Sequence, residues 1–170
     1  MPGGAPAPAA HGPAAPIASP APWDPAPPDL APSRPAPSSA ARSSTALDGY
    51  QLVGTALALR GAPYRNGGTD PRGFDCSGFT QYVFSQYGLS LPREVREQYR
   101  VGTTIKAEDL APGDILFFTT TAPGPSHVAI AVGGDQFVHA PSSTGVVRVE
   151  HLSSSYWSPR YLGARRVTPP

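Results

Sequence analysis

The clearest helical pattern of the chain follows Asp75. Apolar side chains recur one helical turn apart over residues 79–87, so this segment has one apolar face. Gly88 is the residue type expected just after a helix, and Asp75 is of the type preferred at the position that caps a helix start. The pattern therefore predicts a buried helix with Cys76 in its first turn.

Two further segments have helical patterns. Residues 44–60 carry a wide apolar face, with Ser44 or Thr45 as the expected cap, and we interpret this helix as structural. A shorter helix is expected over residues 93–100, where Pro92 precedes the segment and suits the first position of a helix. Both helices come before the segments that have strand patterns.

The second half of the chain has the patterns of strands. The continuous apolar run Ile115–Phe118 indicates a strand that is covered on both faces. Residues 127–140 indicate two strands around a Gly-Gly turn, residues 145–152 a further strand, and residues 161–167 a last strand whose arginines suit a sheet edge. We therefore expect an α+β domain, with N-terminal helices packed on one face of an antiparallel meander.

The turn of the predicted hairpin decides whether His127 and His139 lie on the same face. Side chains alternate between faces along a strand, so the two histidines share a face only when the numbers of paired residues have an even sum. A three-residue loop over residues 133–135 meets this condition, and a two-residue loop meets it only with a β-bulge. We predict one of these two arrangements, with Ala129 and Ala131 leaving room for the helix of the cysteine.

The first 43 residues differ in composition from the rest of the chain. They are rich in Pro, Ala and Ser and carry few charges. Such a segment buries too little apolar area to offset the entropy of ordering it, so residues 1–43 are predicted to be a disordered leader or linker, either a spacer or a tail without a role. Residues 44–170 suffice for one domain. The leader shows neither the basic start nor the apolar core of a signal peptide.

The charge pattern argues against two kinds of partner. The formal net charge is +1 and no long basic run occurs, so nucleic-acid binding has little support. No apolar stretch approaches the roughly 20 residues that cross a bilayer, so no transmembrane segment is expected. Arg93, Arg96 and Arg100 lie in one predicted helix and could contact an acidic ligand, although a charged face in solvent is the favoured interpretation.

Cys76 is the only cysteine of the chain. A helix N-terminus favours thiolate over thiol, and thiolate is the nucleophilic form. With one histidine as base and another to orient it, Cys76, His127 and His139 suit a cysteine hydrolase. Two alternatives stay open: a small buried apolar residue, or a zinc ligand with both histidines and Asp75, although close CxxC or HxxxH spacing is absent. His151 follows a strand and is expected at the surface.

Residues 64–167 resemble the NlpC/P60 family of cell-wall cysteine peptidases. Several motifs occur in the family's order over nearly the whole predicted domain, and the Pro-rich leader is not among them. The motifs are Pro63-Tyr64 with Gly67-Gly68, Phe74-Asp75-Cys76-Ser77-Gly78-Phe79, Leu91-Pro92-Arg93, the run from Leu110 to Phe118, His127-Val128-Ala129-Ile130, Phe137-Val138-His139-Ala140, and the run from Tyr161 to Arg166.

The resemblance implies a papain-like fold and hydrolysis of amide bonds in the stem peptides of peptidoglycan. By position, it implies that Cys76 is the nucleophile, His127 the base and His139 the residue that orients the base. Tyr64 corresponds to the family tyrosine beside the nucleophile, which helps to bind the oxyanion, and Ser77 lies where the family often has a serine lining the cleft. The resemblance implies no metal and no cofactor.

The same resemblance implies a monomer that is exported to the bacterial cell envelope, although no targeting signal is visible in the chain. Alternatives are an amidase or acyltransferase on the same fold, or a wall-binding protein that has lost catalysis. The sequence does not identify the scissile bond. A catalytic Cys76 is expected to react with iodoacetamide at a pH well below the roughly 8.5 of a free thiol.

Overall fold

The computed structural model describes residues 3–4 and 47–169. The predicted leader over residues 1–43 lies outside the described residues apart from two glycines, and so do Ser44 and Thr45, the expected caps of the first helix. No helix among the described residues is long and apolar enough to cross a membrane.

The helices lie in the first half of the described domain. Within residues 47–169 they are α1 (Gly49–Ala58), α2 (Cys76–Ser85) and α3 (Val95–Gln98), with 3-10 turns at Ala107–Asp109 and Ser158–Arg160. α1 begins later than predicted, because the Asp48 carboxylate caps it by accepting from the N–H of Tyr50 at 3.0 Å. α3 is shorter than predicted. Its cap, Glu94, is extended, so Pro92 precedes the helix instead of opening it.

α2 has the start and the end that the sequence predicts. Asp75 is the N-cap, and its Oδ1 accepts a hydrogen bond from the N–H of Gly78 at 2.7 Å. At the other end Gly88 has a φ of 75°, and the N–H of the next residue reaches back to the carbonyl of Phe84. This is the Schellman arrangement, which requires a residue with positive φ after the helix.

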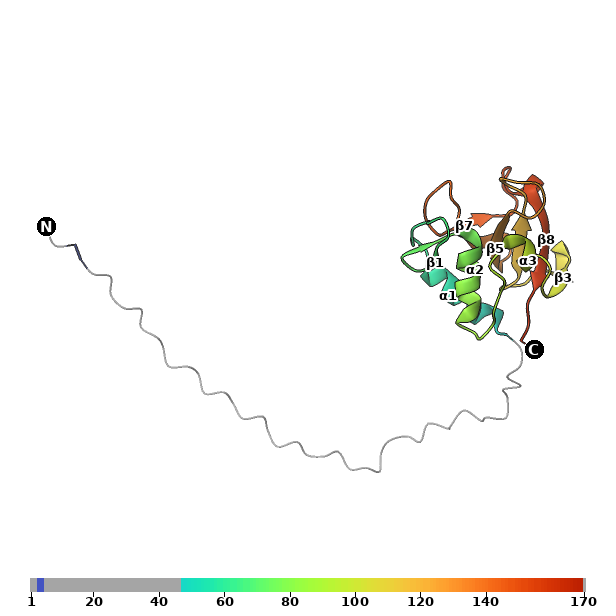
Figure 1. Cartoon of the computed structure of the whole chain (residues 1–170), viewed down its shortest axis with the longest axis horizontal. Coiled ribbons are helices and arrows are strands. Elements are labelled where there is room, and N and C mark those ends of the chain that lie inside the picture. The colour runs from blue at the N-terminus through green and yellow to red at the C-terminus, as the bar shows by residue number, and fades with distance from the viewer. Residues whose placement is uncertain (1–2, 5–46, 170) are drawn as a thin grey trace, which may run out of the picture. The chain divides into compact units, whose positions relative to one another are not determined.

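The domain contains a six-stranded antiparallel sheet in the order β3-β8-β4-β5-β6-β7. Its strands are β3 (Thr103–Ile105), β4 (Ile115–Phe118), β5 (His127–Gly133), β6 (Gln136–His139), β7 (Arg148–His151) and β8 (Tyr161–Arg166). β4 to β7 form the predicted meander, whereas β3 was not predicted. Figure 1 shows α1 and α2 together in front of β5, away from β3 and β8.

The prediction that residues 161–167 form an edge strand is wrong. β8 pairs with both β3 and β4, so it is an inner strand. Its arginines are compatible with this position because their charged ends have partners beside the sheet. Arg166 forms an ion pair with Asp114 at 2.7 Å, and the guanidinium of Arg165 lies 5.0 Å from the ring centroid of Tyr99.

Strand β4 is buried on both faces, as its apolar run predicts. The helix-side core lies between the helices and the sheet and contains Leu52, Val53, Ala56, Phe74, Phe79, Val83, Phe84, Leu89, Leu91, Ile115, Phe117, Val128, Ile130, Val138, Ala140 and Val147. The aromatic face lies on the opposite side and contains Leu116, Phe118, Ala129, Ala131, Phe137, Trp157 and Ala164. Strand β4 contributes alternate residues to each.

Ala129 and Ala131 do not face the cysteine helix, contrary to the prediction. They belong to the aromatic face, and Val128 and Ile130 of the same strand pack against the helices. Because side chains alternate along β5, Val128 and Ile130 are the residues that face α2.

A short antiparallel pair, β1 (Thr69–Asp70) with β2 (Gly73–Phe74), lies in the segment before Cys76. The N–H of Arg65 donates to the carbonyl of Phe74 at 3.0 Å, which fixes the segment that carries Tyr64. A side chain at Gly78 would collide with the carbonyl of Gly68, so the glycine lets this loop touch the start of α2.

Candidate active site

The hairpin places His127 and His139 on one face, as predicted. Ile130 pairs with Val138, which gives the even sum, and a bulge after Ala131 corrects the two-residue turn. The Nε2 atom of His127 lies 2.7 Å from the Nδ1 atom of His139, with the rings nearly perpendicular at 84°. The register argument is therefore confirmed in its bulged form.

Glu150 completes this contact, and sequence reasoning missed it. Its Oε2 lies 2.5 Å from the Nε2 atom of His139, which is fully buried. The register of β6 and β7 pairs His139 with Arg148 and Phe137 with Glu150, so Glu150 lies diagonally across from His139 on the same face. The only available signal was this parity, which requires a strand pairing that no local pattern supplies. We call Glu150, His139 and His127 the imidazole chain.

Trp157 covers the imidazole chain, and sequence reasoning did not assign it to the site. It is 5% exposed, its ring stacks on His127 at 5.3 Å and 26°, and it meets His139 edge-on at 5.1 Å. Phe137 also meets His139 edge-on, at 4.9 Å. Both histidines are therefore held in fixed orientations by aromatic rings, out of bulk water.

The surroundings keep both imidazoles neutral and the carboxylate ionised. Burial, with a smaller contribution from the nearby His139, lowers the pKa of His127 to about 3, although the charge of Glu150 opposes this. Burial also lowers the pKa of His139, although its hydrogen bond to Glu150 opposes this. The pKa of Glu150 is lowered by its hydrogen bond with His139, with further help from the side chain of Trp157 and the charge of Arg148.

A second polar cluster surrounds the start of α2. The Nη2 atom of Arg93 lies 2.5 Å from Oδ2 of Asp75, and its Nη1 donates to Oγ of Ser77 at 2.6 Å. Asp75 also accepts from the N–H of Gly67 at 3.1 Å. The favoured interpretation of Arg93 as a solvated charge is wrong, because the residue neutralises the carboxylate next to the cysteine.

Cys76 lies at the first position of α2, and its side chain is partly exposed. Burial raises the pKa of the Cys76 thiol to about 11, and the charge of Asp75 adds to this rise, while the backbone N–H groups of Val128 and Ser77 oppose it. Burial therefore favours the thiol and opposes the helix N-terminus, which favours the thiolate that the sequence predicts. The sulfur lies beside Val128, the residue after His127, and the resting pair is a neutral thiol and a neutral imidazole.

Tyr64 lies near the start of α2, where the charge of Cys76 acts on its hydroxyl. Partial burial raises the pKa of the Tyr64 hydroxyl, and the charges of Cys76 and Asp75 raise it further, while Arg93 opposes them. The hydroxyl is therefore protonated at neutral pH, and the charge of Cys76 acts on it.

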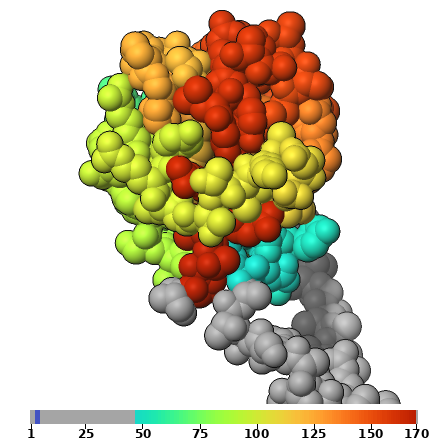
Figure 2. Space-filling view, turned by 90° about the vertical axis from the view of Figure 1, so that its right-hand side faces the viewer, coloured from blue at the N-terminus to red at the C-terminus, as the bar shows by residue number. Residues whose placement is uncertain are grey.

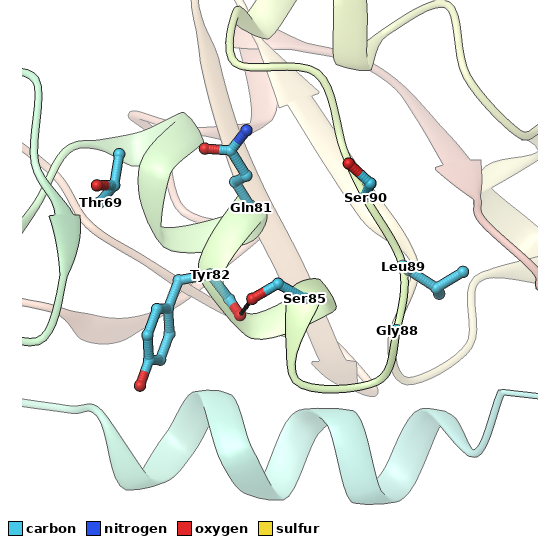
Figure 3. A pocket seen from close by; sticks show the side chains of 7 residues that line it. All are labelled: Thr69, Gln81, Tyr82, Ser85, Gly88, Leu89 and Ser90. Atoms are coloured by element: carbon cyan, nitrogen blue, oxygen red, sulfur yellow. Dashed lines mark hydrogen bonds between the residues drawn. The ribbon is translucent and has the colours of Figure 1, made fainter.

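A cavity of about 420 Å³ is lined by Thr69, Gln81, Tyr82, Ser85, Gly88, Leu89 and Ser90, and Figure 3 shows these residues. None of the predicted site residues is among these seven. In the part of the chain that the structure describes, no group of three or more His, Cys, Asp and Glu side chains is placed to hold a metal ion.

These features can be compared with known proteins. Residues 61–166 match the NlpC/P60 family. The chain belongs to the NlpC/P60 family. Among solved structures, an NlpC/P60 family protein from Bacillus cereus ATCC 10987 shares 33% identity with a TM-score of 0.68, over 73% of this chain and 41% of that one. The NlpC/p60 domain of the peptidoglycan hydrolase SagA shares 37% identity with a TM-score of 0.64, over 71% of this chain and 100% of that one. The family resemblance and the α+β fold are confirmed.

The similar curated proteins are hydrolases. A gamma-DL-glutamyl hydrolase of Bacillus subtilis (strain 168) is 48% identical over 82 residues, which is 46% of this chain and 20% of that protein. The murein DD-endopeptidase MepS/murein LD-carboxypeptidase of Escherichia coli (strain K12) is 43% identical over 81 residues, which is 48% of this chain and 42% of that protein. The chain thus spans less than half the length of these relatives.

Proposed function

We propose that this NlpC/P60 chain is a cysteine endopeptidase that hydrolyses an amide bond in the stem peptides of peptidoglycan. Cys76 is the nucleophile, His127 the general base, His139 the residue that orients the base, and Glu150 a positioning residue at the end of the imidazole chain. The names of similar proteins support the substrate class, and the geometry of the imidazole chain supports the mechanism.

The observation that carries this proposal is the direction of the hydrogen bonds in the imidazole chain. The ionised Glu150 can only accept, so Nε2–H of His139 donates to it. Neutral His139 then has a lone pair on Nδ1, which accepts from Nε2–H of His127. The Nδ1 atom of His127 is left without a proton, and we propose that it receives the proton of Cys76, whose sulfur lies beside Val128.

The reaction follows from these protonation states. As the sulfur of Cys76 attacks the carbonyl carbon of the substrate, its proton moves to Nδ1 of His127. The imidazolium that forms is stabilised through His139 by the charge of Glu150. His127 then gives the proton to the leaving amine, which leaves a thioester. A water molecule, deprotonated by His127, attacks the thioester and releases the acid and the thiol.

Donors for the developing oxyanion come from the start of α2. Two N–H groups there already have acceptors on Asp75. That of Gly78 donates to the carboxylate, and that of Phe79 donates to the backbone carbonyl. The N–H groups of Cys76 and Ser77 instead act on the sulfur, since both lower the pKa of the thiol. These two amides and the hydroxyl of Tyr64 are the proposed oxyanion donors.

The proposed setting follows from the same comparisons. Similar proteins are murein and peptidoglycan endopeptidases, which supports an exported protein of the bacterial cell envelope. The catalytic domain over residues 44–170, the disordered leader over residues 1–43 and the monomeric state remain predictions.

Muropeptide analysis tests the proposal. Purified peptidoglycan is digested with the wild type and with Cys76→Ala, and the products are separated and weighed. We expect new peptide ends with the wild type and none with the variant, while circular dichroism shows the same fold. Cleavage between sugar and peptide would indicate an amidase, and newly joined peptides a transferase. Undiminished cleavage by Cys76→Ala would refute the mechanism.

A further inference from the structure

Three arginines gather on one side of α3, away from Arg93. Arg96, Arg100 and Arg165 line a cavity of about 400 Å³ together with Tyr99 and the loop at Pro123. Figure 2 shows this side of the domain, with β8 in red near the yellow-green segment that contains α3. The arginines come from two distant parts of the chain, so the fold brings their charges together.

No ion pair among the described residues neutralises the charges of this arginine pocket. Among the ion pairs of residues 47–169, none involves Arg96, Arg100 or Arg165. Two of these arginines contact neutral groups: Arg96 donates to the carbonyl of Pro123 at 3.0 Å, and Arg165 lies over Tyr99. No acidic residue lines the cavity. Like charges held together without a counter-ion favour an anionic ligand.

Helix α3, which carries Arg96 of the arginine pocket, is hydrogen-bonded to α2, the helix of Cys76. Gln98 of α3 donates to the carbonyl of Ser77 at 3.2 Å and accepts from the hydroxyl of Thr80 at 2.8 Å, and both bonds are buried. A neighbouring cavity of about 410 Å³ shares Arg96 and Arg100 and is lined by Ser126, the residue before His127. A peptide bound at Cys76 can therefore extend toward these arginines. Glu94 and Glu97 line only this neighbouring cavity, so they favour the arginine pocket as the anion site.

The named activities of similar proteins suggest which anion is available. A γ-linked glutamyl residue uses its side-chain carboxyl in the amide, so its α-carboxylate stays free, and a carboxypeptidase acts on a chain that ends in a free carboxylate. Carboxylates suit the two-pronged donor geometry of arginine.

We propose that the arginine pocket of Arg96, Arg100 and Arg165 binds a free carboxylate of the peptide substrate, at a distance from the scissile bond. This inference rests on the proposed function for its substrate class. It assigns the pocket to substrate recognition and leaves the chemistry to Cys76 and the imidazole chain.

Binding to an inactive protein tests the pocket without requiring hydrolysis. The full chain carrying Cys76→Ala is titrated by calorimetry with a γ-glutamyl tetrapeptide and with the same peptide whose α-carboxylates are amides. We expect the free carboxylates to bind about tenfold more tightly, and this difference to shrink at high salt. Adding Arg100→Gln and Arg165→Gln should remove the difference and leave the affinity for the amide peptide unchanged.

Two control variants sharpen the test. Arg60→Gln removes an exposed arginine that also donates to a backbone carbonyl but lies outside the cavity, and it should change neither affinity. Arg100→Lys with Arg165→Lys keeps the charges and should keep most of the difference, which separates charge from loss of folding.

Some outcomes would overturn the inference. Equal affinity for both peptides, or a loss of affinity for both in the double glutamine variant, would show that the pocket does not read carboxylates. Competition by inorganic phosphate as strong as that by the peptide would indicate a general anion site instead. If the wild type does not cleave peptidoglycan but binding still depends on the carboxylates, the proposed peptidase activity is refuted and the proposed carboxylate pocket is not.

Discussion

The two faces of the central sheet perform different tasks with the same strands. The helix-side core is a packed set of apolar side chains, whereas the aromatic face encloses His127, His139 and the carboxylate of Glu150 among rings. Apolar packing stabilises the fold, while burying imidazoles favours their neutral form. The difference indicates that one face supplies stability and the other keeps a base unprotonated.

Truncation in the helix-side core should have the largest effect. Phe84 is fully buried in α2, so Phe84→Ala should lower the free energy of unfolding by about 3–5 kcal/mol. Urea denaturation followed by circular dichroism measures this loss. The exposed variant Ser85→Ala on the same helix should lie within about 0.5 kcal/mol of the wild type. A loss below about 1 kcal/mol for Phe84→Ala would contradict the claim that the helix-side core supplies the stability of the fold.

Neutralising the imidazole chain should reduce activity instead of stability. Glu150→Gln keeps the shape but loses the charge that stabilises the imidazolium, so kcat/KM should fall about 10²-fold. Peptide release assayed from pH 5 to 9 should show a changed pH profile as well, which a loss of packing would not produce. Glu108→Gln, an exposed acid, serves as the control. An unchanged profile with normal kcat/KM would show that Glu150 has no role in positioning.

Removing the Tyr64 hydroxyl tests the other side of α2. Tyr64→Phe removes one proposed oxyanion donor and should lower kcat by about 10²-fold, with little change in KM. Steady-state kinetics on a stem peptide measures both constants. A change in KM alone would assign Tyr64 to substrate binding and not to the oxyanion.

Acid should lower the free energy of unfolding through His127, which is buried on the aromatic face. The folded-state pKa of His127 is lowered to about 3, so the unfolded chain takes up a proton near pH 6.5 that the folded chain does not. Stability is therefore fully present above about pH 6.5 and should fall by about 2 kcal/mol between pH 7 and 5. Urea midpoints against pH measure the slope. His127→Asn should flatten it, and the exposed His151→Asn should not.

The sequence predicted the elements that a local pattern specifies. The apolar spacing after Asp75 predicted α2, and the parity of the hairpin predicted that His127 and His139 meet. Features that depend on distant segments were missed. Glu150 is near His139 only through the register of β6 and β7, and β8 is an inner strand only because β3, of three residues, pairs with it.

The protonation state of Cys76 was also beyond local reasoning. A helix N-terminus is visible in the sequence and favours a thiolate, but the burial that raises the pKa of the thiol depends on how β5 packs against α2. We therefore expect iodoacetamide to alkylate the free protein slowly at pH 7 and faster only toward pH 10–11. A fast reaction at pH 6 would restore the thiolate that the sequence predicted.

The most direct test of the account is the tautomer of each buried imidazole, measured by ¹⁵N NMR at pH 7 on the wild type and Glu150→Gln. We expect the wild type to show both rings neutral and protonated on Nε2, with Nδ1 of His127 bare, and the variant to show a mixture of tautomers. A proton on Nδ1 of His127, or a charged ring at either position in the wild type, would contradict the proposed path of the proton from Cys76.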